Sequence, residues 1–179
     1  MHIYLDGEVY SIVEFQHVKP GKGGAFVRTK LRKLSTGQNI EKTFRAGERV
    51  ETAFVERKRL QYLYSSDDEI VCMDPEDFDQ HSFNADLLGD ARKYLTEGLD
   101  LTAVLVDGKV VGLEVPPFVE LKVVETDPGF KGDTVSGGSK PATLEGGAVV
   151  NVPFHINVGD TIKVDTRTDT YLERVKTAE

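Results

Sequence analysis

Residues 19–24, with the sequence Lys19-Pro20-Gly21-Lys22-Gly23-Gly24, interrupt two apolar runs at residues 9–15 and 26–34. Proline cannot donate to a β ladder and glycine weakens a strand interior, so this segment cannot continue either run. We therefore predict that it projects as a loop between two strands. Short apolar runs bounded by such turn residues are typical of β structure.

Hairpin signals lie on both sides of this loop. Asp6-Gly7 separates residues 3–5 from residues 9–15, and Thr36-Gly37 separates residues 26–34 from residues 40–44. Turn pairs of this kind between apolar runs predict antiparallel hairpins. Residues 1–53 are therefore predicted to form one small barrel-like sheet.

The middle of the chain carries two more hairpin signals and one short helix. Apolar runs at residues 60–64 and 69–73 flank a polar turn, and runs at residues 101–106 and 110–115 flank Asp107-Gly108. Between the two hairpins, Asp90 offers a helix N-cap and Gly98 a stop. Four strands and one short helix over residues 54–116 fit an oligonucleotide/oligosaccharide-binding barrel.

Pro116-Pro117 is the clearest linker, because neither residue donates to a sheet and the pair stiffens the connection. Five short β runs follow, at residues 118–124, 148–152, 155–158, 161–165 and 171–175. This is about the number of strands that another such barrel needs. The predicted fold is all-β, with three small β-barrel domains at residues 1–53, 54–116 and 117–179.

Hydropathy and cysteine content favour an intracellular location. No stretch approaches the roughly 20 continuous apolar residues that span a bilayer, and the first residues lack a basic lead before an apolar block. The single cysteine, Cys72, lies in an apolar run and is predicted to be a buried small hydrophobe. We expect a cytoplasmic protein with no membrane contact.

Charge is segregated along the chain, although the net charge of −8 alone argues against a nucleic-acid binder. Residues 1–62 hold 12 Lys/Arg against seven Asp/Glu, residues 63–116 hold three against 13, and residues 117–179 hold seven against 10. The first segment can therefore present a basic face to RNA, while the acidic middle discourages non-specific binding.

Motifs for catalysis, metal binding and cofactor binding do not occur. Lys22 lacks the upstream Gly and downstream Ser/Thr of a phosphate-gripping loop, and no Gly-x-Ser-x-Gly elbow exists. The four histidines are far apart in sequence, which leaves no metal-ligand spacing with one cysteine. We predict no catalytic residue, no metal and no cofactor.

The loop itself is suited to reaching into a narrow site. Pro20 restricts its approach, while Gly21, Gly23 and Gly24 remove side chains that would hold a partner's backbone away. Lys22 adds a long stem with a charge at neutral pH. The basic residues around the loop are candidates for contacts with RNA phosphates, with residues 28, 30 and 32 on one strand face: Lys19, Arg28, Lys30, Arg32 and Lys33.

Three stretches resemble bacterial elongation factor P, from Leu5 to Lys176. The first is residues 18–23 with residues 25–28 and 41–44, and the second is Gln61-Tyr62-Leu63-Tyr64. The third is Thr126-Asp127-Pro128-Gly129 with Gly132-Asp133-Thr134 and a C-terminal signature over residues 140–159. Together they are far more specific than any single motif.

The resemblance implies a first domain of the SH3-like/KOW type and two oligonucleotide-binding-type barrels in an L shape like that of a tRNA. It also implies a monomeric factor that binds the 70S ribosome between the P and E sites and rescues stalling at consecutive prolines. Lys22 matches the loop tip that approaches peptidyl-tRNA in the P site, and in many members a modifying enzyme extends it. Gly132, Asp133 and Thr134 match a loop that approaches the E-site codon region.

Two other interpretations stay open. The basic first segment and the barrel-like units also suit a general RNA-binding or ribosome-associated structural module that contacts rRNA. The other interpretation is that the chain is a diverged paralogue of the same family, with a narrower role in translation. The family usually has further residues before Leu5 that form its first strand. We expect that edge to be absent, truncated or replaced by residues 1–4.

Overall fold

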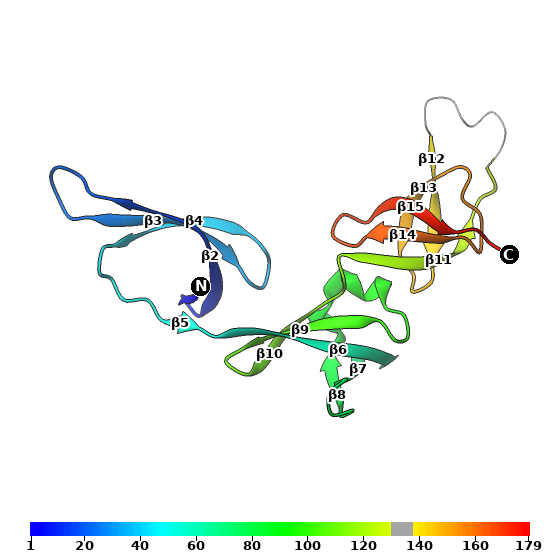
Figure 1. Ribbon diagram of the computed structural model, residues 1–179, viewed down its shortest axis with the longest axis horizontal. Helices are drawn as coiled ribbons and strands as arrows, with labels where there is room; N and C mark the ends of the chain where they lie inside the picture. Colours follow the sequence, from blue (N-terminus) through cyan, green and yellow to red (C-terminus); the bar gives the residue numbers. More distant parts are fainter. Residues whose placement is uncertain (130–137) are drawn as a thin grey trace. The chain divides into compact units, whose positions relative to one another are not determined.

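The computed structural model describes residues 1–129 and 138–179. Across these residues the chain is predominantly β and forms three five-stranded sheets (Figure 1). The prediction of an all-β protein with three β domains is confirmed. The boundaries predicted at residues 53/54 and 116/117 stay a prediction.

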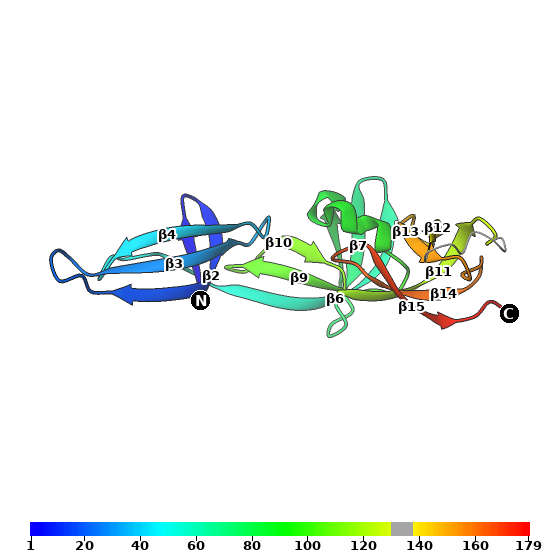
Figure 2. The ribbon, with the colours of Figure 1, turned by 90° about the horizontal axis from the view of Figure 1, so that it is seen from above.

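The first sheet has the order β4-β3-β2-β1-β5. Its antiparallel strands lie side by side in two perpendicular views (Figures 1 and 2). They are β1 (His2–Leu5), β2 (Glu8–Val18), β3 (Phe26–Lys33), β4 (Asn39–Arg45) and β5 (Thr52–Ala53). Strand β1 pairs with β2 on one side and β5 on the other, so residues 2–5 occupy an inner position rather than leaving an open edge.

The second sheet has the order β10-β9-β6-β7-β8. Its strands are β6 (Val55–Ser66), β7 (Glu69–Met73), β8 (Gln80–Asn84), β9 (Asp100–Val106) and β10 (Lys109–Glu114). The two predicted hairpins are confirmed, whereas strand β8 was not predicted from the sequence. Cys72 is fully buried as predicted, and burial raises the pKa of its thiol to about 11.

The predicted helix takes a different form. Two 3₁₀ segments, η1 (Ala85–Leu87) and η2 (Gly89–Tyr94), replace a single helix that begins at Asp90. The cap is Asn84, whose side chain accepts a hydrogen bond from the backbone N–H of Asp86. Gly89 has a positive φ at the start of η2, which separates the two segments. Leu95 already has an extended backbone, so the helical segment ends before Gly98.

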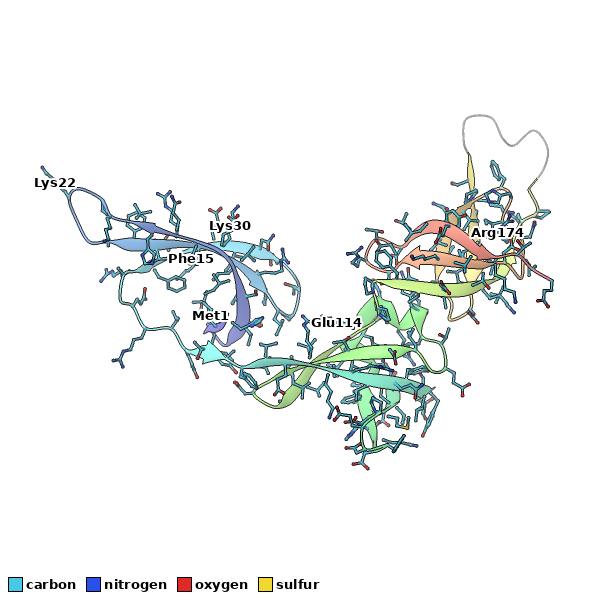
Figure 3. The ribbon with its side chains drawn as sticks, viewed as in Figure 1. Met1, Phe15, Lys22, Lys30, Glu114 and Arg174 are labelled. Atoms are coloured by element: carbon cyan, nitrogen blue, oxygen red, sulfur yellow. The ribbon has the colours of Figure 1, made fainter. Side chains whose placement is uncertain are left out.

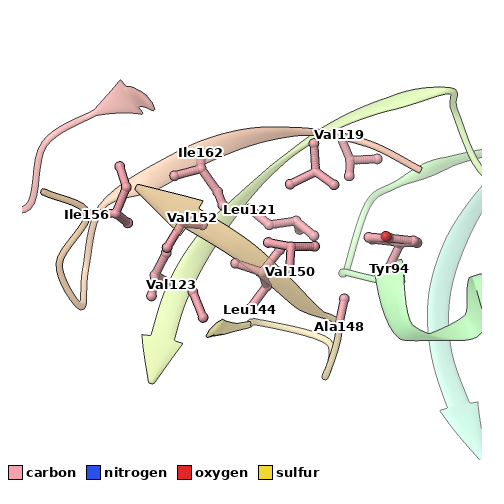
Figure 4. Close-up of a cluster of buried hydrophobic side chains, with 12 residues drawn as sticks. Tyr94, Val119, Leu121, Val123, Leu144, Ala148, Val150, Val152, Ile156 and Ile162 are labelled. Atoms are coloured by element: carbon pink, nitrogen blue, oxygen red, sulfur yellow. The ribbon is translucent and has the colours of Figure 1, made fainter. Parts of the chain in front are cut away.

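The third sheet has the order β13-β12-β11-β14-β15 and holds an apolar core of buried side chains. Its strands are β11 (Phe118–Thr126), β12 (Ser139–Leu144), β13 (Val149–Pro153), β14 (Thr161–Asp165) and β15 (Thr170–Lys176). Alternate residues of these strands point inward, so buried Val, Leu and Ile side chains gather between them (Figure 4). Strands β13 and β15 contact each other, as in a closing barrel.

The prediction of a strand at residues 155–158 is wrong. Residues 155–158 form a turn, and β12 supplies the missing strand instead. The backbone N–H of Ile156 donates to Pro153 O and that of Asn157 to the carboxylate of Asp160, so neither joins a ladder. Ile156 is fully buried, which accounts for an apolar pattern without a strand.

By contacts the described chain divides into two compact units. Unit 1 comprises Met1–Lys58 with Val104–Gly112, and unit 2 comprises Arg59–Ala103 with Leu113–Glu179. In unit 1, Asp107 accepts hydrogen bonds from the Tyr4 hydroxyl and, at 3.0 Å, from the Phe54 backbone N–H. This carboxylate fastens the β9–β10 turn to the first sheet.

In unit 2, Tyr94 joins segment η2 to the third sheet. Its ring belongs to the apolar core, and its hydroxyl donates to Asp169, which also pairs with Lys93 at 3.1 Å. Burial and the Asp169 carboxylate raise the Tyr94 pKa. Gly146 lies so close that a Cβ there would be 2.6 Å from the Lys93 carbonyl oxygen. These contacts unite η2 and the third sheet in one packing unit.

Within the described part of the chain, no helix is long and apolar enough to cross a membrane.

Replacing Tyr94 with Phe tests the hydrogen bond to Asp169. The ring stays in the core while one part-buried hydrogen bond to a carboxylate is lost, so we expect the free energy of unfolding to fall by about 1–2 kcal/mol. Tyr171→Phe is the matched control, because the Tyr171 hydroxyl makes no hydrogen bond within the described residues. Urea unfolding measures both variants, and equal losses would contradict the role of the bond.

Asp160 makes stability depend on pH. Burial alone would raise the pKa of this fully buried carboxyl, but N–H bonds from Asn157 and Ala178 and the charge of Arg174 outweigh burial and lower it. The stabilisation is therefore complete above the unfolded pKa of about 4 and is lost as pH falls through the lower folded value. Asp160→Asn should cost about 1–3 kcal/mol at neutral pH.

The pH series separates this effect from a general packing defect. The difference in unfolding free energy between the parent and Asp160→Asn should shrink below about pH 4. Exposed Glu173, replaced by Gln, serves as the control on the neighbouring strand. A difference that stays constant across the whole pH range would contradict the electrostatic explanation.

Candidate functional site

The hairpin of β2 and β3 carries the candidate site at its end. Val18 pairs with Phe26 as the last register pair, and residues 19–25 connect the two strands. The backbone N–H of Ala46 donates to Ala25 O at 3.0 Å, which holds the returning arm of the loop against the β4 side. Lys22 stands at the tip and points away from the sheet (Figure 3).

The glycines keep this loop slim. Gly23 has a φ of 103°, in the region where other residues are strained, so the backbone itself requires glycine there. At Gly21 and Gly24 an added Cβ would have no heavy atom of another residue within 4 Å, their chain neighbours aside. These two glycines are therefore not needed for packing, and their effect is to leave the flanks of Lys22 free.

The basic row of β3 has the predicted placement. Arg28, Lys30 and Arg32 are exposed and share one face, while Thr29 and Leu31 between them are buried on the other. Figure 3 shows Lys30 and Phe15 on opposite faces of the hairpin. Their contact with RNA stays a prediction.

The surroundings of this row are less basic than the sequence suggests. Lys30 Nζ lies 3.4 Å from Glu14 Oε2, and Arg32 Nε donates to the Asn39 side-chain oxygen at 3.3 Å. The guanidinium of Arg28 lies over the Phe26 ring, with Cζ 5.5 Å from the centroid. Much of the positive charge at Lys30 is therefore neutralised locally.

The other candidates lie apart from the row. Lys33 is on the opposite face and pairs with Glu8 at 3.6 Å, whereas Lys19 and Pro20 are exposed at the start of the loop. Gly132, Asp133 and Thr134 fall outside the described residues.

Sequence reasoning missed the polar residues that line the neighbouring strands. Glu14 and Gln16 face β3 from β2, and Glu41 and Thr43 face it from β4. A bulge between Ile12 and Glu14 shifts the register, so simple alternation along β2 does not predict which side chains share the face of Lys30. In the described ranges, no three His, Cys, Asp or Glu side chains are grouped closely enough to hold a metal ion.

Comparison with protein families and known proteins agrees with this architecture. Three family models match, described as the elongation factor P KOW-like domain over residues 1–50, the OB domain over residues 55–113, and "Elongation factor P, C-terminal" over residues 119–174. A solved translation initiation factor 5A family protein from Naegleria fowleri is similar in fold, with a TM-score of 0.52 at 17% identity, over 64% of this chain and 89% of that one.

Curated relatives match along almost the whole chain. Elongation factor P of Pelotomaculum thermopropionicum is 59% identical over 97% of this chain and 94% of its own. Elongation factor P of Natranaerobius thermophilus is 58% identical over 98% of this chain and 94% of its own. The chain therefore belongs to the elongation factor P family of translation elongation factors.

Proposed function

We propose that this chain binds the 70S ribosome between the P and E sites and promotes peptide-bond formation at consecutive prolines. In this proposal it acts in the cytoplasm as a monomer, contacts rRNA, and positions peptidyl-tRNA with the Lys22 loop. The observation that carries the proposal is the exposed lysine at the tip of a slim, glycine-flanked loop at the end of the β2–β3 hairpin.

The physical basis is alignment of the reacting ends. Proline is a conformationally restricted secondary amine, so two successive prolines react slowly mainly because their reacting groups are poorly oriented. A cationic side chain that steadies the acceptor end of the tRNA lowers this entropic barrier. The ribosome supplies the bond-forming chemistry, and the factor needs no catalytic residue of its own.

Replacing Lys22 with Ala tests the role of the loop tip. Translation through a run of prolines on a reconstituted ribosome should lose most of the stimulation, about tenfold or more in rate, because positioning errors are costly in such reactions. Exposed Lys109 on the second sheet, replaced by Ala, provides the control with equal loss of charge.

The same assay distinguishes the proposal from a general RNA-binding module. If the Lys22→Ala variant stimulates proline synthesis as strongly as the parent protein does, Lys22 has no role in positioning the tRNA. Tight binding of the parent protein to free RNA, with no effect on proline synthesis, would favour the RNA-binding module instead.

A further inference from the structure

A groove of about 730 Å³ lies on the first sheet over β2, β3 and β4. Its lining includes Lys30 and also the row of Phe15, Thr29 and Lys42, which alternates with the Lys30 row along the strands. Six exposed polar side chains from three strands share the face of Lys30: Glu14 and Gln16 on β2, Arg28 and Lys30 on β3, and Glu41 and Thr43 on β4. The phosphate track predicted from alternation on β3 alone would run along this groove.

Strand register divides the groove into two rows of opposite charge. In one row Lys30 lies between Glu14 and Glu41, which gives one positive and two negative charges. In the other row Arg28 lies between Gln16 and Thr43, which gives a single positive charge with neutral polar neighbours. The Arg28 row is the one nearer the Lys22 loop, two register pairs or about 7 Å from the end of the hairpin.

Of the two lining cations in the Arg28 and Lys30 rows, Arg28 is the one that is suited to an external anion. It makes no ion pair with any described residue, and its guanidinium is oriented by the Phe26 ring. A guanidinium has five donors in a planar fork that matches phosphate oxygens. Gln16 and Thr43 add neutral donors on either side.

The row of Glu14, Lys30 and Glu41 disfavours the binding of a second phosphate. Lys30 already pairs with Glu14, and Glu41 stands across from it in register. A phosphate at this position would approach two carboxylates within a few ångströms, where like charges repel.

We propose that the groove holds one phosphodiester group of RNA at Arg28, and that Glu14 and Glu41 direct the RNA backbone away from the next row. This inference rests on the proposed function, because the same hairpin presents Lys22 to a tRNA. Counting at most about 3.4 Å per residue along the hairpin, Arg28 and Lys22 lie within about 20 Å of each other. One bound RNA can therefore contact both.

Three variants of the full chain test the proposal, with dissociation constants measured on ribosomes that carry a P-site tRNA. Arg28→Gln should weaken binding about tenfold and reduce the slope of log K against log salt by about 1, as expected for one lost phosphate contact. Lys30→Gln should cost less than about threefold, and Glu14→Gln should tighten binding because it frees Lys30. Lys109→Gln serves as the unchanged control, and thermal unfolding checks that each variant is folded.

Two results would overturn the inference. One is Arg28→Gln binding within about twofold of the parent, and the other is Lys30→Gln losing as much affinity as Arg28→Gln. Parallel measurements with vacant ribosomes identify the source of the phosphate: a loss that persists there assigns it to rRNA, and a loss that requires the tRNA assigns it to the tRNA.

The proline-synthesis assay separates this inference from the proposed function. If Lys22→Ala abolishes stimulation while Arg28→Gln leaves both affinity and salt slope unchanged, the proposed function stands and the Arg28 contact is wrong. If the parent protein fails to stimulate at all, the proposed function fails regardless of Arg28.

Discussion

The pairing of β2 with β3 is the constraint on which the proposed site depends. Its last pair, Val18 with Phe26, fixes where the strands end, and the proline and glycines beyond it cannot extend the ladder. Lys22 therefore lies in a connection that extends beyond the end of the paired strands. The same pairing, shifted by the bulge between Ile12 and Glu14, sets which side chains meet Arg28 and Lys30 across the groove.

A second constraint acts in unit 2, where the Tyr94 side chain makes both apolar and polar contacts. Its ring fills the core of the third sheet, while its hydroxyl bonds to Asp169 between β14 and β15. Because Gly146 also packs directly against the Lys93 backbone, segment η2 is held by both apolar and polar contacts. Across the described residues, short 3₁₀ segments and not long helices complete the β structure.

The sequence predicts those features that local chemistry determines. Turn pairs such as Asp6-Gly7 and Asp107-Gly108 locate the hairpins, and the proline and glycines around Lys22 locate the exposed loop. Strands β8 and β12 escape prediction because their sequences are polar or contain proline, as in Gln80–Asn84 and Ser139–Leu144. Tertiary pairing, and not local propensity, makes them strands.

The same limit applies to the site. Alternation on β3 correctly groups Arg28, Lys30 and Arg32, because a strand has a period of two. It cannot show that Glu14 and Glu41 flank Lys30, since that depends on register between strands and on a bulge. The local pattern therefore overestimates the positive charge on this face of β3. It also treats Arg28 and Lys30 as equivalent, although their neighbours on the adjacent strands differ in charge.

Crosslinking from position 22 tests the central claim most directly. A photoreactive group placed there, on ribosomes stalled at consecutive prolines, should attach to the acceptor end of the P-site tRNA. The same group at exposed Ser35, in the turn at the other end of β3, should not. Attachment from position 22 only to other parts of the ribosome, or to no RNA, would contradict the claim that Lys22 positions peptidyl-tRNA.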